Sequence, residues 1–181
     1  PGAENDYDPE LLEHARVRFD AMPDEERAAL EKNIIAGLPG GEGSYDRDGI
    51  REAIARFIAL GTDGMRESLL AFLRAVVPVA EESGVRLCIH PDDPPFSLFG
   101  LPRVVSTAED ARILLDAVPS PSNGLTLCAS SFGARADNDL VAIAREFGDR
   151  IHFVHLRNVK RESDGSFYES DHLDGDNDMV G

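Results

Sequence analysis

Three short apolar runs between residues 85 and 155 each end in a residue that can bind a transition metal. The runs are Val85–His90, Leu125–Cys128 and Ile151–His155. Two imidazoles and a thiolate form a ligand set typical of transition-metal sites. The types of His90, Cys128 and His155 therefore indicate metal chemistry, provided that the fold brings these residues together.

The segments between the three runs have the apolar spacing of helices, which gives an alternating order of strands and helices. This order predicts an α/β fold with a parallel sheet. The carboxyl ends of parallel strands gather at one edge, where such folds keep their functional residues. We therefore expect His90, Cys128 and His155 to converge. Each alone has an ordinary alternative, a hydrogen-bonded core histidine or a small buried cysteine, and the absence of any metal stays open.

Other residues on these strands are less suited to bind the metal. Cys88 lies two residues before His90 and is expected to pack one layer deeper on the same face. On the last strand, Ile151, Phe153 and His155 should share the buried face, while His152 points the other way, toward a helix or the surface.

Polar residues in the loops offer charge for a substrate or a second layer of contacts around the metal. Asp92 and Asp93 are outer partners of a metal site or caps of the following Pro-Pro turn, and we favour the turn. Arg135, Arg157 and Lys160 can supply positive charge for an anion. Arg157 is the best placed, because it follows His155 by two residues.

Composition excludes several classes of partner. The 181 residues carry a formal charge of −16, which argues against binding of nucleic acid or anionic membrane because the field repels phosphate. No apolar run reaches the roughly 18 residues of a membrane span. The two cysteines fall on strands, where metal binding or burial is more typical than a disulfide, so we expect a cytoplasmic protein. The start at Pro1, without Met, predicts that the natural N-terminus lies upstream.

The helical pattern predicts where the remaining elements begin and end. We expect helices at 8–19, 23–35, 46–60, 65–83, 106–118 and 137–147. Asp63, the Ser106–Glu109 capping box and Asp137 should cap three of them, Pro78 should kink the fourth and Gly84 should end it. Gly37–Gly43 reads as a loop, with Ser44 as the next cap, and lacks the ending of a phosphate-binding loop. Beyond Arg157 the chain is polar and predicts no further core element.

Several longer motifs resemble mannonate dehydratase, an enzyme family of hexuronate degradation. They are Asn33–Gly40, His90–Pro95, Phe99–Ser106, Arg135–Leu140, His155–Arg157 and His172–Asp176, the last reading His-Leu-Asp-Gly-Asp. The resemblance extends over essentially the whole chain. It implies a metal-dependent (β/α)₈ TIM barrel related to xylose isomerase-like enzymes, which converts D-mannonate to 2-keto-3-deoxy-D-gluconate with Mn²⁺ or Fe²⁺.

The resemblance also implies which residues bind the metal and where the regions of the chain begin and end. The His, Cys and His that bind the metal in the family match His90, Cys128 and His155. The family's fourth ligand, an Asp in an Arg-Pro-Asp-His-Gly segment, has no counterpart here. Because a full barrel needs about 250 residues, we expect residues 1–181 to be one domain that forms an incomplete, middle-to-late portion of it. Residues 1–60 would be a helical and loop insertion, and 61–181 the strand–helix repeats with the metal site.

Loss of water from D-mannonate needs a base at C2, an acid at C3 and a Lewis acid at the carboxylate. By the family pattern the base and acid lie outside this chain, so we name neither. Arg157 and His172 are expected to line the site for this sugar acid, and a homodimer is the expected assembly. The alternatives are a metal-dependent sugar isomerase or epimerase on the same barrel, and a non-catalytic protein with a closed zinc site.

Overall fold

The computed structural model describes residues 7–37, 46–163 and 165–181, and the chain divides into two compact units. The first unit comprises Pro1–Gly61 with Ser97–Pro102, and the second comprises Thr62–Phe96 with Arg103–Gly181. All the residues singled out for metal or substrate binding belong to the second unit.

The first unit is helical in its described part. Helix α1 spans Pro9–Ala21 and begins after Asp8, whose carboxylate accepts a hydrogen bond from the Glu10 amide at 2.8 Å. Helix α2 spans Asp24–Gly37, and its first turn holds three acidic residues, which suit the positive end of a helix dipole. Both predicted helices are confirmed. The predicted Gly37–Gly43 loop and Ser44 cap fall on 38–45, outside the described residues.

Helix α3 spans Arg47–Glu82 and joins two helices that the sequence predicted separately. The boundary between the two predicted helices remains as a break at Gly61, which adopts φ 69° and ψ 178° inside α3. Because the chain resumes its helix at once, Asp63 lies within α3, and its prediction as a cap was wrong. Backbone angles stay helical at Pro78. The predicted stop is confirmed, since Gly84 follows the helix with a φ of 66°.

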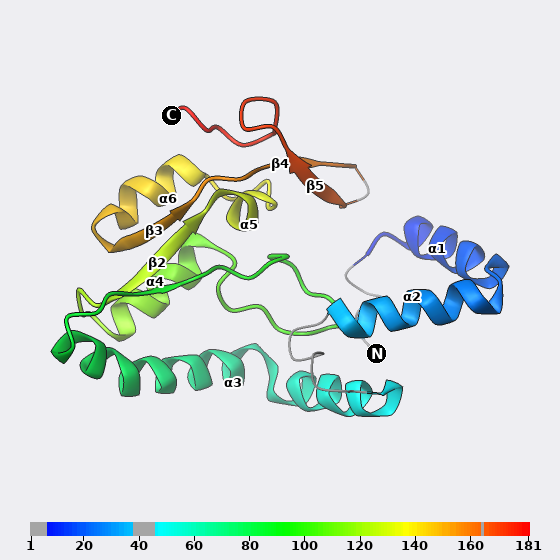
Figure 1. Ribbon diagram of the computed structural model, residues 1–181, viewed down its shortest axis with the longest axis horizontal. Coiled ribbons are helices and arrows are strands. Elements are labelled where there is room, and N and C mark those ends of the chain that lie inside the picture. The colour runs from blue at the N-terminus through cyan, green and yellow to red at the C-terminus, as the bar shows by residue number, and fades with distance from the viewer. Residues whose placement is uncertain (1–6, 38–45, 164) are drawn as a thin grey trace. The chain divides into compact units, whose positions relative to one another are not determined.

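A three-stranded parallel sheet forms the centre of the second unit, in the order β1-β2-β3 (Figure 1). Strand β1 spans Leu87–Ile89, β2 spans Asn123–Cys128 and β3 spans Ile151–His155. Both pairings are parallel, as the alternation of strands and helices predicted. The three runs with metal-capable ends are therefore neighbouring strands that point the same way.

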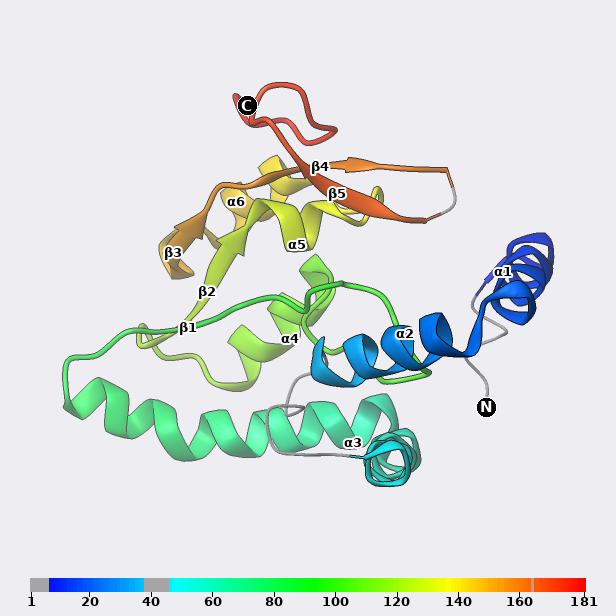
Figure 2. The same ribbon diagram turned by 45° about the vertical axis from the view of Figure 1, so that its right-hand side comes forward.

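Helices cover one face of this sheet. The second half of α3 packs beside α4 (Ala108–Ala117) and under β1 (Figure 2). Helices α4 and α6 (Leu140–Phe147) enclose a second cluster with β2. The buried members of the first cluster are Leu70, Leu73, Val77, Val104, Val105, Leu114 and Val118. Those of the second are Ala111, Leu115, Leu125, Phe132, Ile143 and Phe147.

On the face of the sheet opposite the helices, side chains of the outer strands β1 and β3 are exposed. Cys88 is exposed, so the expectation that it packs in a deeper layer was wrong for the described residues. Phe153 is 58% exposed. A register shift pairs Ile151 with Leu125 and Phe153 with Thr126, which face opposite sides of β2. Ile151 therefore packs with the helices, and the strict alternation predicted for β3 was wrong at this bulge.

Two predicted caps moved by one or two residues, and one predicted loop contains a helix. The capping box of α4 uses Thr107 and Asp110, one residue after the predicted pair. Helix α6 is capped by Asp139, whose carboxylate accepts from the Ala142 amide, and not by Asp137. The segment after Cys128, predicted as a loop, begins with a short helix α5, Ala129–Gly133. A 3₁₀ turn, Gly148–Arg150, leads into β3.

The end of the chain carries structure that the sequence did not predict. Strands β4 (Asn158–Arg161) and β5 (Phe167–Ser170) form an antiparallel hairpin. Val159 and Asn158 are both 1% exposed, so the hairpin has a buried base despite its polar composition. No helix in the described ranges combines the length and apolarity needed to cross a membrane.

Candidate metal centre

His90, Cys128 and His155 converge where the three parallel strands end. Their candidate donor atoms all lie within 4.8 Å of one another. The Cys128 Sγ is 3.5 Å from His155 Nδ1, and the rings of His90 and His155 are 6.1 Å apart between centroids. Within the described ranges, no other His, Cys, Asp or Glu joins this group. The sequence thus identified all the members of the cluster, and the register of β2 and β3 pairs Cys128 with His155 directly.

The backbone carbonyl of the next residue, Pro91, orients the ring of His90. His90 Nδ1 lies 2.7 Å from the carbonyl oxygen of Pro91, an acceptor only, so this nitrogen carries the proton and donates. The lone pair of the imidazole is then on Nε2. A hydrogen bond of this kind is what usually fixes the tautomer of a metal-binding histidine. His90 is exposed, which leaves room for a ligand beside it.

Two serine hydroxyls surround the sulfur of Cys128. Ser131 donates to Sγ at 3.2 Å, and Ser130 Oγ lies 3.3 Å from the same sulfur. All three residues are completely buried. Hydroxyl donors stabilise negative charge on sulfur, and the thiolate is the form of cysteine that binds metals. The donor set and its surroundings therefore fit a transition metal.

Arg157 lies next to this group and is held at both sides of its guanidinium. Its Nε donates to Ser130 Oγ at 2.8 Å and its Nη2 to Asp93 Oδ2 at 2.9 Å. The Glu169 carboxylate is 4.0 Å from Nη1. The structure thus places Arg157 one hydroxyl away from Cys128, with a cation directed toward the same strand end.

His172, the second residue predicted to line a substrate site, is exposed and contacts the backbone between His155 and Arg157. Its Nε2 lies 2.8 Å from the carbonyl of Leu156 and donates to it. Its own carbonyl accepts from Asn158 Nδ2 at 2.8 Å. His172 is therefore near the site through the main chain, and its ring is outside the three-residue group.

Other candidates do not reach the centre. His152 Nδ1 donates to the carbonyl of Leu87 at 2.7 Å, at the start of β1, so it bridges strands where a helix or surface contact was predicted. Its Nε2 is buried and has no hydrogen-bond partner. Lys160 Nζ donates to the Asp174 carbonyl at 3.0 Å. Cys88 lies outside the group.

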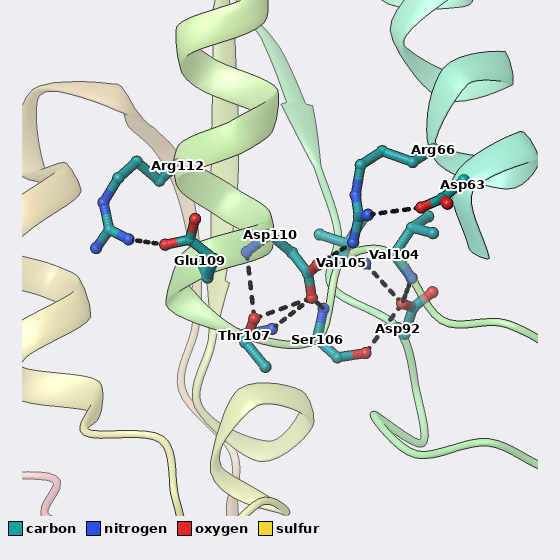
Figure 3. A network of polar contacts seen from close by, with 10 residues as sticks. All are labelled: Asp63, Arg66, Asp92, Val104, Val105, Ser106, Thr107, Glu109, Asp110 and Arg112. Atoms are coloured by element: carbon teal, nitrogen blue, oxygen red, sulfur yellow. Dashed lines mark hydrogen bonds and ion pairs between the residues drawn. The ribbon is translucent and has the colours of Figure 1, made fainter.

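Asp92 anchors the loop that follows His90 (Figure 3). Its Oδ2 accepts from the amides of Val104 and Val105 at 2.9 and 2.8 Å, and from Ser106 Oγ at 3.1 Å. Its role as a cap of the Pro-Pro turn was therefore wrong, because its partners lie at the far end of the loop. The anchor fixes the chain two residues beyond His90.

Asp110 forms the adjoining network at the start of α4 (Figure 3). Arg66 Nη2 donates to its Oδ1 at 2.9 Å, while the amides of Ser106 and Thr107 donate to its Oδ2 at 3.0 and 3.1 Å. The nearby ion pair of Arg112 with Glu109 is more exposed to solvent than that of Arg66 with Asp110. Asp92 and Asp110 thus hold residues 104–107 from two sides.

Arg135 joins the loops that follow β1 and β2. Its Nη1 reaches the carbonyl of Pro95 at 3.5 Å, and its Nε and Nη2 donate to both oxygens of Asp137 at 3.0 and 2.6 Å. The hydrogen bond from Arg135 lowers the pKa of Asp137 from its ordinary value, its charge adds to that effect, and partial desolvation opposes it. Asp137 therefore stays charged and orients the guanidinium of Arg135.

Two residues close to the centre were not predicted as contributors, and a third, Asp93, was assigned to a turn in preference to an outer partner of the site. Ser130 and Ser131 contact the Cys128 sulfur, and Asp93 pairs with Arg157. The available signal was the pair of serines two and three residues after a strand-end cysteine, since a helical turn at that point brings their hydroxyls back to the sulfur. The partnership of Asp93 and Arg157 spans 64 residues of sequence and had no local signal.

Comparisons with known proteins point to one family. The sequence model of the D-mannonate dehydratase (UxuA) family matches residues 6–181. A mannonate dehydratase of Saccharophagus degradans is 74% identical over 97% of this chain and 44% of its own length. Mannonate dehydratase 2 of Agrobacterium fabrum is 61% identical over 99% of this chain and 45% of its own length.

A solved structure gives the same result in three dimensions. The crystal structure of mannonate dehydratase from Streptococcus suis serotype 2 superposes with a TM-score of 0.68 at 34% sequence identity. The match covers 78% of this chain and 42% of that one. The chain spans less than half the length of the curated relatives it matches.

Proposed function

Because this chain belongs to the mannonate dehydratase family, we propose that it serves the metal-dependent dehydration of D-mannonate to 2-keto-3-deoxy-D-gluconate in glucuronate degradation. The observation that carries the proposal is the convergence of two imidazoles and a buried thiolate within 4.8 Å at the ends of three parallel strands. A packed sheet has no structural need for such a cluster.

His90, Cys128 and His155 would hold the metal. When bound, the metal supplies a Lewis acid that binds the carboxylate and a hydroxyl of the sugar acid and lowers the cost of removing the C2 proton. The described residues offer three protein ligands for it, and the family pattern places a fourth, an Asp, outside this chain. A thiolate among the ligands favours Mn²⁺ or Fe²⁺ over the harder Mg²⁺.

Arg157 would bind the substrate carboxylate. Its guanidinium lies one serine away from Cys128 and is 31% exposed, so an anion can approach it. Asp93 occupies one side of the same guanidinium and holds it in place at 2.9 Å. Charge-assisted hydrogen bonds from a guanidinium suit a carboxylate.

His172 would contribute to the site indirectly, through a contact with the main chain. Its ring donates to the Leu156 carbonyl and so holds the main chain between His155 and Arg157. Replacement by Ala should raise the Michaelis constant or lower turnover. If both constants stayed at their wild-type values, His172 would have no part in the site.

The fold proposal follows from the same family. Residues 61–181 would form strand–helix repeats of a (β/α)₈ barrel and residues 1–60 a helical insertion, all within one domain. The parallel order β1-β2-β3, with helices on one face, supports this arrangement. A cytoplasmic homodimer that takes a sugar acid, and neither nucleic acid nor membrane, completes the proposal.

The test is the identity of the product that the full-length protein forms from D-mannonate. Dehydration yields a 2-keto-3-deoxy acid and releases water, whereas an isomerase or epimerase on the same barrel leaves the mass of the sugar acid unchanged. Mass spectrometry of the product decides between them. A product lighter by one water supports the proposal, and one of unchanged mass assigns the site to an isomerase.

A further inference from the structure

The hydroxyl of Ser130 lies between two groups that the proposed function uses separately. Its Oγ is 3.3 Å from Cys128 Sγ and 2.8 Å from Arg157 Nε. Ser130 and Cys128 are completely buried, so bulk water does not compete for these contacts. The three groups form a continuous path from a half-buried cation to the candidate metal ligand.

The direction of each hydrogen bond follows from the chemistry of its donor. A guanidinium N–H donates and cannot accept, so Ser130 Oγ is the acceptor from Arg157. The one hydroxyl hydrogen of Ser130 is then free to point to Cys128 Sγ. Asp93 holds the other side of the guanidinium at 2.9 Å, which keeps Nε directed at Ser130.

We propose that Ser130 couples Arg157 to Cys128, so that the Arg157 guanidinium tunes how much charge the sulfur donates to a bound metal. The inference rests on the proposed metal site. A cation that donates to Ser130 Oγ polarises its O–H bond, and hydrogen bonds in a chain strengthen one another in a low-dielectric interior. Ser130 is thus a positioning residue, and a carboxylate that draws Arg157 away from it changes the metal's ligand field.

Ser131 provides a matched control within the same turn. It donates to the same sulfur at 3.2 Å and is equally buried. Among the described residues it makes no hydrogen bond to Arg157, so it reaches the sulfur but not the guanidinium. Any effect of Arg157 on the sulfur should therefore pass through Ser130 and be independent of Ser131.

The test uses the full-length protein loaded with Co²⁺, without substrate, and reads the sulfur-to-cobalt charge-transfer band. Ser130→Ala and Ser131→Ala should each move the band to longer wavelength, because a sulfur that loses a donor releases its electrons more easily. Arg157→Ala should move it in the same direction by a smaller amount. Ser130→Ala should also weaken Co²⁺ binding by about 10- to 100-fold, the usual effect of losing an outer partner of a metal ligand.

A double-mutant cycle isolates the coupling. The Ser130→Ala/Arg157→Ala protein should show the same band as Ser130→Ala alone, whereas the shifts of Ser131→Ala and Arg157→Ala should add. A band that Arg157→Ala leaves unmoved, or full additivity with Ser130→Ala, would overturn the proposal, as would a wild-type protein without the band. Because no turnover is measured, the result stands apart from whether D-mannonate is the substrate.

Discussion

At the scale of single residues, the proposed chemistry of the centre depends on the one sulfur among its candidate ligands. Cys128 is completely buried, and its sulfur contacts the hydroxyls of Ser130 and Ser131 and lies 3.5 Å from His155 Nδ1. Cys128→Ser keeps the size of the side chain but removes the thiolate. The loss of metal affinity should exceed the roughly 10- to 100-fold that outer partners contribute, as measured by titration of the metal-free protein.

His152 is the control for that experiment because it lies on the same strand but outside the group. His152→Gln should retain the wild-type affinity for metal. Full metal occupancy in Cys128→Ser, or an equal loss in His152→Gln, would show that the ligand assignment is wrong.

A second prediction at this scale concerns the charge of Asp137. Arg135 lowers its pKa, so the carboxylate favours the folded state at pH values above its ordinary pKa of about 3.9, and this contribution is lost as pH falls through the lowered value. Arg135→Gln should return the pKa of Asp137 toward its ordinary value. Carboxyl-carbon NMR titration of both proteins measures this shift, and equal midpoints would contradict the role of Arg135.

At the scale of elements, the start of α4 is where a partly buried ion pair can be compared with an exposed one. Arg66 contacts Asp110, whose carboxylate also accepts from two backbone amides, and their side chains are 23% and 12% exposed. Arg66→Ala should lower the free energy of unfolding by about 1.5–3 kcal/mol, the usual cost of losing a hydrogen bond to a charged group. Denaturant unfolding measures the loss.

Arg112, which lies on α4 beside Asp110, provides an exposed control for Arg66. It contacts Glu109 and Glu146 at the surface, where ion pairs are screened and cost side-chain entropy. Arg112→Ala should leave the unfolding midpoint within experimental error. If both variants lost the same stability, the anchoring of α4 through Asp110 would be contradicted.

The elements also show what the sequence could predict. The order of strands and helices, the parallel sheet and the convergence of His90, Cys128 and His155 follow from local patterns and one rule of topology. The hairpin at 158–170 was missed because its burial depends on Asn158, whose side chain holds the segment at 172–177 through contacts that no local pattern records. Asp92 was misjudged for the same reason, since its partners lie 12 to 14 residues away.

At the scale of the whole molecule, the exposure of the sheet face opposite the helices provides a test of the proposed barrel. Cys88 is exposed in this chain, on the face opposite the helices. Closure of a (β/α)₈ barrel turns that face into a packed interior. In the native full-length protein, Cys88 should therefore resist a thiol reagent until denaturant is added, as peptide mass spectrometry detects. Rapid labelling of Cys88 in the folded protein would contradict closure around this sheet.

The most direct measurement is the formation of 2-keto-3-deoxy-D-gluconate from D-mannonate by the full-length protein before chelation, after it, and after Mn²⁺ or Fe²⁺ is restored. We expect product before chelation, none after it, and recovery with added metal in the wild-type protein but not in Cys128→Ser. Product that persists without metal, or a Cys128→Ser protein that recovers fully, would contradict the claim that His90, Cys128 and His155 hold the metal on which dehydration depends.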